Sequence, residues 1–282
     1  MTRVLIVGDE RKGHARTLAE RLFRELRTLG HLVEIEMDRN ASLASRDAEL
    51  VIVLGGDGSL LAAARRMGTQ QRPTLGINLG RLGFLTAFGT EEASPGVRAA
   101  LAGELVEEPR VMLAVDVLRA KGGTSDPVLC LNDAVIARTS RAGMVVVSAS
   151  RPDRELATYT GDGLVVATPL GSTAYSLAAG GPVLSPRLDA LVLTPLAPHM
   201  LTLRPLVLPL GDGVDVRVQE SGGDEGCTLS IDGQVHVDVA LGDLVRIRPT
   251  AVRFRHLTKG PASFFQVLRD KFGWAESPRR GG

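Results

Sequence analysis

Three glycines and one acid follow a strongly apolar run in the first third of the chain. Residues 51 to 66 read VIVLGGDGSLLAAARR, which places the GGDG run between a predicted strand and a predicted helix that Ser59 would cap. Glycine serves where the chain turns sharply or where a ligand touches the backbone, and a helix N-terminus favours phosphate. A carboxylate beside phosphate suits a sugar hydroxyl or a phosphate-bound Mg²⁺ ion. On these residues alone, an Asp57 that merely caps the helix is an equal alternative.

Two further stretches combine polar groups with strand-like sequence. Residues 159 to 182, YTGDGLVVATPLGSTAYSLAAGGP, are rich in glycine and hydroxyl groups, which suits a polar ligand such as a nucleotide or a tight packing turn. Asn132 and Asp133 interrupt the apolar run VLCLNDAVIAR. Buried polar groups need partners, and a ligand ribose or a nearby loop would supply them. A third GDG triplet, at 211 to 213, is interpreted as a hairpin turn.

The elements that must position these residues divide the chain into two patterns. Up to about residue 105, apolar strands alternate with helical repeats, and we expect strands at 3–7, 50–54 and 73–78, with Gly30 ending the first helix. This order predicts an α/β domain with a Rossmann-like parallel sheet covered by helices on both faces. From Pro109 on, short β-rich runs separated by turn residues predict a mainly β domain.

The predicted domains are residues 1–105, a β-rich segment at 106–258 and a C-terminal helix with a tail at 259–282. Four of the aromatic residues lie in SFFQVLRDKFGW, so we expect this helix to pack back on the first domain or on a second subunit. The stretch 191–210 contains four prolines, which favours buried strands and turns over a membrane span.

Composition narrows the class of protein. A net charge of +1 from 33 basic and 32 acidic residues gives no basic field for nucleic acid or a membrane surface. Cys130 and Cys227 lie in apolar context, which predicts buried free thiols and fits the cytoplasm. The five histidines have no metal-ligand spacing, and we expect no metal site built from protein side chains.

Taken together, the motifs resemble the NAD kinase family. GGDGS at 55–59, the Asn132–Asp133 pair and GDGLVVATPLGSTAYSLAAGGP at 161–182 match the family pattern in order and spacing, and the resemblance covers nearly the whole chain. It implies transfer of the ATP γ-phosphate to the 2′-hydroxyl of the adenosine ribose of NAD, with Mg²⁺ or another divalent metal accompanying ATP. It also implies an active site between the two domains and a homodimer or homotetramer.

The resemblance further implies a role for each matching position. Asp57 would be the catalytic acid/base, Asn132 and Asp133 would contact ribose, and Asp162 with Thr173–Ala178 would hold NAD partly across a subunit boundary. The implied nucleotide-binding positions are Gly55, Gly56, Asp57, Gly58, Asn132, Asp133, Thr160, Asp162, Thr173, Ala174, Tyr175, Ser176, Leu177, Ala178 and Gln234.

Three positions depart from the family pattern. Leu170 stands where the family usually has Thr, Thr160 where many relatives carry a basic residue, and Asp133 where Glu is commoner. Two other interpretations stay open: a lipid or sugar kinase, because such kinases share the GGDG turn, and a dinucleotide-binding sensor without turnover, which Leu170 and Thr160 would favour.

Overall fold

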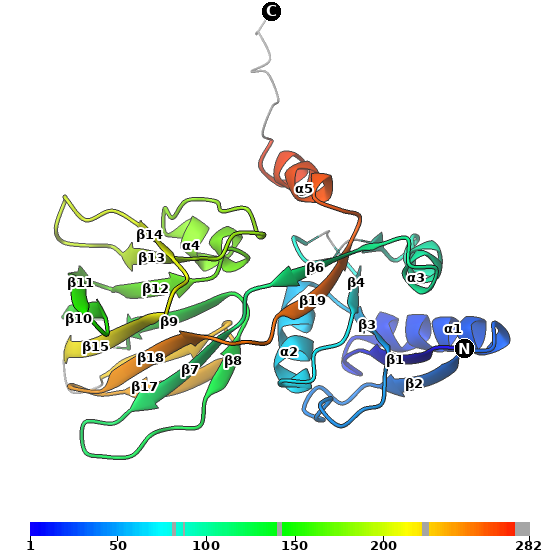
Figure 1. Cartoon of the computed structure of the whole chain (residues 1–282), viewed down its shortest axis with the longest axis horizontal. Helices are drawn as coiled ribbons and strands as arrows, with labels where there is room; N and C mark the ends of the chain where they lie inside the picture. The colour runs from blue at the N-terminus through cyan, green and yellow to red at the C-terminus, as the bar shows by residue number, and fades with distance from the viewer. Residues whose placement is uncertain (81–82, 87, 140–142, 222–225, 274–282) are drawn as a thin grey trace, which may run out of the picture. The chain divides into compact units, whose positions relative to one another are not determined.

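The computed structural model describes residues 1–80, 83–86, 88–139, 143–221 and 226–273 of the chain. The chain divides into two compact units, the first formed by Met1–Pro109 together with residues from Arg255 onward, the second by Arg110–Phe254. Figure 1 shows an α/β unit at the N-terminal, blue end of the colour scale and a unit made mostly of strands in green to orange. The predicted fold class, an α/β part followed by a mainly β part, is confirmed.

The first unit is built on a parallel sheet whose described strands number seven. Their order is β2-β1-β3-β4-β19-β6, with β5 pairing β4, and the pairs from β2 to β4 and from β4 to β5 and β19 are parallel. The bounds are β1 Arg3–Val7, β2 Leu32–Glu36, β3 Leu50–Leu54, β4 Thr74–Asn78, β5 Phe88–Gly89, β6 Val106–Arg110 and β19 Phe254–Thr258. The sequence pattern did not indicate that β19, from the far end of the chain, completes this sheet.

Helices cover both faces of the sheet. Leu75 and Ile77 of β4 share one apolar cluster with α1 (Gly13–Thr28) and α3 (Ala93–Leu101). Gly76 lies between them on the opposite face, where a Cβ atom would come within 2.5 Å of Leu60 of α2 (Asp57–Met67). The predicted end of α1 is confirmed, because Gly30 has φ +83° and the N–H groups of residues 30 and 31 bond the last helical turn.

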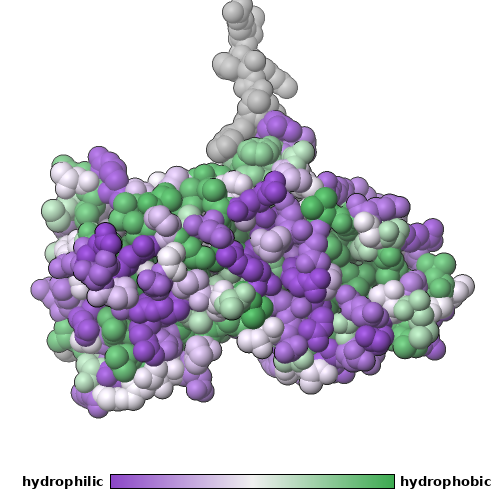
Figure 2. Space-filling model, viewed as in Figure 1, coloured by the Kyte–Doolittle hydropathy of each residue, from purple (hydrophilic) through white to green (hydrophobic). Residues whose placement is uncertain are grey.

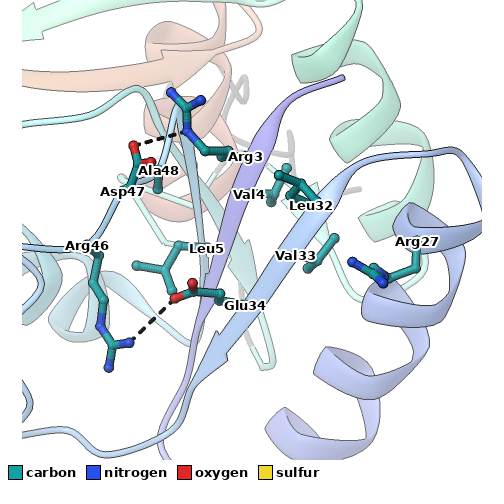
Figure 3. Close-up of a pocket in the computed structure, with 10 residues that line it drawn as sticks. All are labelled: Arg3, Val4, Leu5, Arg27, Leu32, Val33, Glu34, Arg46, Asp47 and Ala48. Atoms are coloured by element: carbon teal, nitrogen blue, oxygen red, sulfur yellow. Dashed lines mark hydrogen bonds and ion pairs between the residues drawn. The ribbon is translucent and has the colours of Figure 1, made fainter.

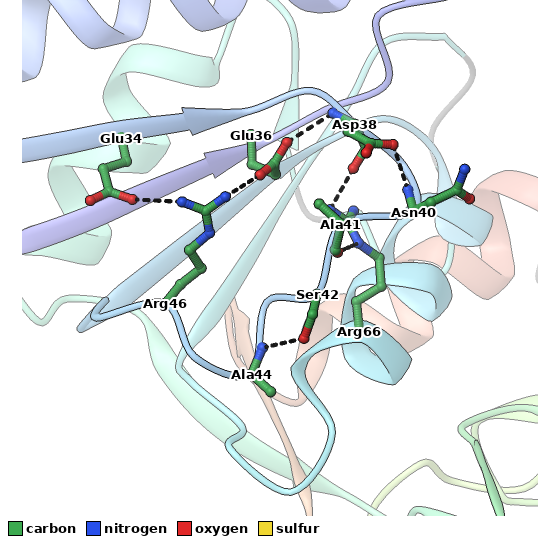
Figure 4. Close-up of polar contacts among 9 residues, drawn as sticks. All are labelled: Glu34, Glu36, Asp38, Asn40, Ala41, Ser42, Ala44, Arg46 and Arg66. Atoms are coloured by element: carbon green, nitrogen blue, oxygen red, sulfur yellow. Dashed lines mark hydrogen bonds and ion pairs between the residues drawn. The ribbon is translucent and has the colours of Figure 1, made fainter.

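A network of charged groups fastens the segment between β2 and β3 (Figure 4). Arg46 forms ion pairs with Glu34 and Glu36 of β2. Arg66, in the last turn of α2, donates at 2.7 Å to the carbonyl oxygens of Asp38 and of Ala41. This segment therefore links the carboxyl end of β2 to the C-terminal end of α2.

The second unit has two sheets that enclose an apolar core. In the described chain each sheet has six strands, in the orders β11-β10-β15-β18-β7-β8 and β14-β13-β12-β9-β16-β17. Side chains from both sheets form one buried cluster. The bounds of the first sheet are β7 Leu113–Leu118, β8 Val128–Cys130, β10 Val145–Arg151, β11 Arg154–Gly161, β15 Val214–Glu220 and β18 Leu244–Pro249. The bounds of the second are β9 Asp133–Arg138, β12 Gly163–Ala167, β13 Ala190–Leu196, β14 Leu206–Pro209, β16 Cys227–Ile231 and β17 Val235–Val239.

The connection at residues 211–213 is not the hairpin that the sequence predicted. It joins β14 to β15, and these strands belong to different sheets. Gly211 and Gly213 have φ +47° and +81°, so a glycine turn is present. The triplet therefore marks a passage from one sheet to the other, which local sequence does not distinguish from a hairpin. The stretch 191–210 forms β13, a turn and β14, as predicted.

The C-terminal helix α5 (Ala262–Phe272) returns to the first unit. The ring of Phe272 lies 5.7 Å from that of Phe84, and Leu268 is buried. Phe265 of the same helix is 55% exposed. The predicted tail after residue 273 lies outside the described residues. No described helix is long and apolar enough to cross a membrane, and hydrophilic and hydrophobic residues are interspersed on the face seen in Figure 2.

Candidate functional site

The GGDG turn connects β3 directly to α2. Gly55 has φ +152°, and a Cβ atom there would lie 2.1 Å from the Ser59 hydroxyl oxygen, so this position requires glycine. The helix begins at Asp57 with Gly56 as its N-cap and has no side-chain cap. The predicted cap at Ser59 is therefore wrong, because Ser59 is the third residue of the helix. Its hydroxyl instead accepts a long hydrogen bond of 3.4 Å from Lys12 Nζ.

The Asp57 carboxylate does not cap its own helix. Its Oδ2 accepts the Phe84 N–H at 2.8 Å and its Oδ1 accepts the Leu85 N–H at 3.0 Å. A Cβ atom on Gly83 would lie 1.8 Å from Oδ1, so the loop after β4 can approach the carboxylate only because residue 83 is glycine. The interpretation of Asp57 as a mere helix cap is therefore wrong, and both of its carboxylate oxygens accept backbone N–H groups of the loop after β4.

The sequence reading missed the residues that shape this loop. Asn78, the last residue of β4, donates through Nδ2 to the Thr86 hydroxyl at 2.8 Å, and its Oδ1 accepts the Gly80 N–H at 2.8 Å. The Thr86 hydroxyl also accepts the Gly83 N–H at 3.0 Å. A polar residue ending a buried strand, followed by closely spaced glycines, is the signal that could have pointed to it. Asn78 therefore holds the loop in contact with Asp57.

In the second unit, the Asn132–Asp133 pair lies at the turn from β8 into β9. Asp133 is 5% exposed, and its burial together with the nearby Asp232 raises the pKa of its carboxyl from 3.8 to about 7. The backbone N–H of Tyr175 works in the opposite direction. Burial also raises the pKa of Asp232. The Asp133 carboxyl therefore changes protonation near neutral pH, where it can donate or accept a hydrogen bond.

The hydroxyl-rich stretch folds against the same turn. After β12, the Thr168 hydroxyl donates to the Leu131 carbonyl at 2.6 Å and the Thr168 N–H to the Asn132 carbonyl at 2.8 Å. A Cβ atom on Gly171 would lie 2.1 Å from the Asn132 carbonyl oxygen, so this glycine permits the contact. The 3₁₀ turn Gly171–Thr173 and the short helix α4 (Tyr175–Ala178) then follow.

Several hydroxyls of this stretch are used inside the protein. Ser172 donates to the Pro169 carbonyl at 2.6 Å, Thr173 donates to the Leu170 carbonyl at 3.1 Å, and Ser176 is hydrogen-bonded to Thr194 at 2.8 Å. Leu170 is 7% exposed, so this departure from the family pattern buries an apolar side chain. Tyr175, in contrast, is 49% exposed at the start of α4 and is available to a ligand.

The remaining predicted residues divide between the two ends of the β9–β12 strand pair. Gln234 follows the turn that contains Asp232, and its N–H donates to the Ile231 carbonyl at 3.0 Å, near the Asn132–Asp133 turn. Asp162 instead precedes β12 and accepts a hydrogen bond from Arg138 Nε at 2.7 Å. Because Ala167 pairs with Asp133 and Gly163 with Ala137, Asp162 lies at the far end of these strands, roughly 17 Å away. Thr160, in β11, lies on that side as well.

A pocket of about 360 Å³ lies at the amino ends of strands of the first unit's sheet (Figure 3). It is lined by the first residues of β1 and β2, among them Arg3 and Leu32, and by Asp47 and Ala48 just before β3. Ligands of open α/β sheets bind at the carboxyl ends of the strands. The GGDG turn and the Asp57 contacts, at the carboxyl ends of β3 and β4, are therefore the better candidate.

Both units of the chain are similar to domains of known proteins. Residues 4–105 match the ATP-NAD kinase N-terminal domain and residues 131–257 match the ATP-NAD kinase C-terminal domain. A solved yeast NADH kinase complexed with NADH superposes with a TM-score of 0.85 at 23% identity, covering 100% of this chain and 90% of the yeast chain. An NAD kinase from Archaeoglobus fulgidus, solved with ATP, gives 0.74 at 27% identity, covering 96% and 97%. The fold is therefore that of a two-unit nucleotide kinase.

Sequence relatives specify the family within that class. The chain is 38% identical to the NAD kinase of Citrifermentans bemidjiense over 289 aligned residues, covering 98% of this chain and 100% of the relative. It is 41% identical to the NAD kinase of Geobacter sulfurreducens, covering 81% and 80%. The chain belongs to the NAD kinase family.

Proposed function

We propose that the protein is an NAD kinase, which transfers the γ-phosphate of ATP to the 2′-hydroxyl of the adenosine ribose of NAD and releases NADP and ADP. The observation that carries the proposal is the 38% identity to an NAD kinase over nearly the full length of both chains. The geometry supports it, because Asp57 and the Asn132–Asp133 turn are each held by several hydrogen bonds. Phosphoryl transfer depends mainly on such positioning and on charge neutralisation.

We assign Asp57 to the reacting hydroxyl. Each carboxylate oxygen accepts one backbone amide and keeps a lone pair for a second partner. The two amides fix the direction of the carboxylate, so it can orient a 2′-hydroxyl and accept its proton late, as the bond to phosphorus forms. We assign the main chain of Gly55, Gly56 and Gly58 to the nucleotide, and at Gly56 an added Cβ atom would meet no atom within 4 Å.

We assign the polar turn of the second unit to the dinucleotide. Asn132 and Asp133 would bond ribose hydroxyls, Tyr175 would stack or hydrogen-bond, and Gln234 would add a further contact. Thr173 and residues 174–178 would line the site chiefly through their backbone, because the Thr173 and Ser176 hydroxyls already have partners.

Self-association completes the proposed site. Asp162 and Thr160 lie at the opposite end of the β9–β12 pair from Asn132 and Asp133. A homodimer or homotetramer would allow these residues of one copy to reach NAD bound by another copy. Light scattering on the purified protein measures the mass, and a monomer that retains full activity would contradict this arrangement.

We propose that Mg²⁺ or another divalent metal enters with ATP and neutralises phosphate charge there. In the described part of the chain no three His, Cys, Asp or Glu side chains are grouped to hold a metal ion, so we assign it no protein ligand. The buried free thiols of Cys130 and Cys227 support a cytoplasmic location.

A coupled assay tests the function. The protein is incubated with NAD, ATP and MgCl₂, and NADP is detected with an NADP-specific dehydrogenase. Continuous NADP formation is expected, whereas NAD binding without turnover would indicate a sensor. Phosphorylation of a lipid or free sugar in place of NAD would overturn the proposal.

Asp57→Asn tests the role of the carboxylate, because it keeps the size and removes the charge. We expect kcat to fall about 100-fold or more, the range for loss of a general base. Asp38→Asn is a matched control, since Asp38 Oδ1 also accepts a loop amide after a strand of the same sheet. Near-normal turnover in Asp57→Asn, or an equal loss in Asp38→Asn, would contradict the assignment.

A further inference from the structure

Asp232 lies directly under the Asn132–Asp133 turn and bonds three consecutive amides. Its Oδ1 accepts the N–H groups of Leu131 at 3.1 Å, Asn132 at 2.7 Å and Asp133 at 3.2 Å, and its Oδ2 accepts Leu131 again at 3.0 Å. The Cys130 thiol donates to Oδ1 at 3.3 Å. A carboxylate that accepts this many donors fixes the direction of the chain that supplies them.

The backbone at Asp232 adopts an unusual conformation to make these contacts. Its φ is +51°, a left-handed value that costs free energy for any residue with a Cβ atom. In this conformation the Asp232 N–H donates to the Asp133 carbonyl at 2.9 Å while the carboxylate faces the amides of residues 131–133. Asp232 is also 7% exposed and lies close to Asp133, so burial of its carboxylate and repulsion between the two carboxylates add to the cost in free energy.

The backbone carbonyl groups of residues 131 and 132 are held by other residues, Thr168 and Gly171. Thr168 bonds the Leu131 and Asn132 carbonyls, and Gly171 packs on the Asn132 carbonyl. The main chain of residues 131–133 is therefore held through its amides by Asp232 and through its carbonyls by Thr168. The Asn132 side-chain amide, in contrast, makes no hydrogen bond with the described residues and stays available.

We propose that Asp232 is a positioning residue of the NAD site: it clamps the amides of Leu131–Asp133 so that the Asn132 amide and the Asp133 carboxyl meet the ribose hydroxyls in fixed geometry. This inference rests on the proposed function. Asp232 itself does not touch the nucleotide. Its contribution is to NAD binding and not to ATP binding, since all its contacts converge on residues 130–133.

Asp232→Asn tests the clamp, because Asn tolerates the left-handed conformation, loses the negative charge that strengthens all of these hydrogen bonds, and keeps one acceptor oxygen in place of two. We expect Kd for NAD, measured by titration calorimetry, to rise about tenfold or more, with KM for ATP changed less than twofold. Asp243→Asn is the matched control. Asp243 is 3% exposed and accepts the amides of Ala120 and Ala240, away from this turn. Unchanged NAD affinity in Asp232→Asn, or equal weakening in Asp243→Asn, would overturn the proposal.

Amide hydrogen exchange separates this inference from the proposed function. The amides of Leu131, Asn132 and Asp133 should exchange at least tenfold faster in Asp232→Asn and unchanged in Asp243→Asn, whether or not the wild type makes NADP. Unchanged exchange at these amides would overturn the clamp. If Asp232→Asn does not fold, Thr168→Val decides, because it removes the opposite hold on Leu131. That variant should weaken NAD binding selectively, and wild-type affinity in it would refute the proposal.

Discussion

Replacing Asp133 by Asn should remove a loss of stability that sets in as the pH rises. Asp133 is buried beside Asp232, with Cys130 and the backbone of Tyr175 also facing this region, and the pKa of its carboxyl is raised from 3.8 to about 7. The folded protein therefore holds a proton that the unfolded chain has already released between these two values. In that window the free energy of unfolding falls as the pH rises.

The magnitude follows from the two pKa values. Below pH 4 both states are protonated and the group has no effect, and above pH 7 both are ionised and the cost is constant. Between pH 5 and pH 8 the wild type should lose about 2 to 3 kcal/mol from this group. Asn carries no charge at either pH, so the variant lacks this loss.

Urea unfolding followed by circular dichroism at pH 5 and pH 8 measures the difference. Asp243→Asn is the control: backbone and Arg119 hydrogen bonds lower the pKa of Asp243, so it is ionised in both states throughout this range. That variant should keep the wild-type slope. An equal pH slope in wild type and Asp133→Asn would refute the reasoning that burial and Asp232 govern this carboxyl.

Two further predictions concern packing. Gly83→Ala should lower the free energy of unfolding by about 1 to 3 kcal/mol, because the new Cβ atom would lie 1.8 Å from Asp57 Oδ1. Gly80→Ala in the same loop is the control and should change the free energy of unfolding by less than about 1 kcal/mol, because its Cβ atom would lie 3.9 Å from the nearest neighbour. Equal effects of the two variants in a urea titration would contradict the close approach of Gly83 to Asp57. Cys130 and Cys227 should react with Ellman's reagent at pH 8 about 100-fold more slowly than a free thiol until urea unfolds the protein. The reason is burial, which raises the pKa of Cys227 to about 11 and also raises the pKa of Cys130. Rapid labelling of the folded protein would contradict the burial of the two thiols.

Local periodicity was enough to predict most elements of the first unit. The strands at 3–7 and 50–54 and the end of the first helix at Gly30 depend on neighbouring residues, and the structure has them there. The strand β19 was not predicted as part of that sheet, because its pairing with β4 joins residues more than 180 positions apart. The hairpin at 211–213 failed for a similar reason, since the turn sequence does not say which sheet receives the next strand.

The candidate site was predicted by residue type but not by contact. GGDG indicated an open backbone, yet nothing in it showed that Asp57 would accept amides from Phe84 and Leu85. Likewise, SIDGQ directed attention to Gln234, whereas Asp232, two residues earlier, makes the bonds to the Asn132–Asp133 turn. The spacing of glycines predicts where another group approaches the main chain closely, but only the tertiary structure shows which group that is.

The strand β19 also determines the order in which the protein matures on the ribosome. Residues 110–254 are continuous in the chain, so the second unit has all its strands before Thr258 has been made. The first unit, although its synthesis begins earlier, keeps the edge of β4 open until β19 emerges. Early translation thus yields an unfinished sheet with an exposed edge, the kind of nascent species that aggregates. A premature stop codon just before β19 would therefore damage the fold of the first unit, although most of that unit lies far from the stop, and would leave the second unit intact.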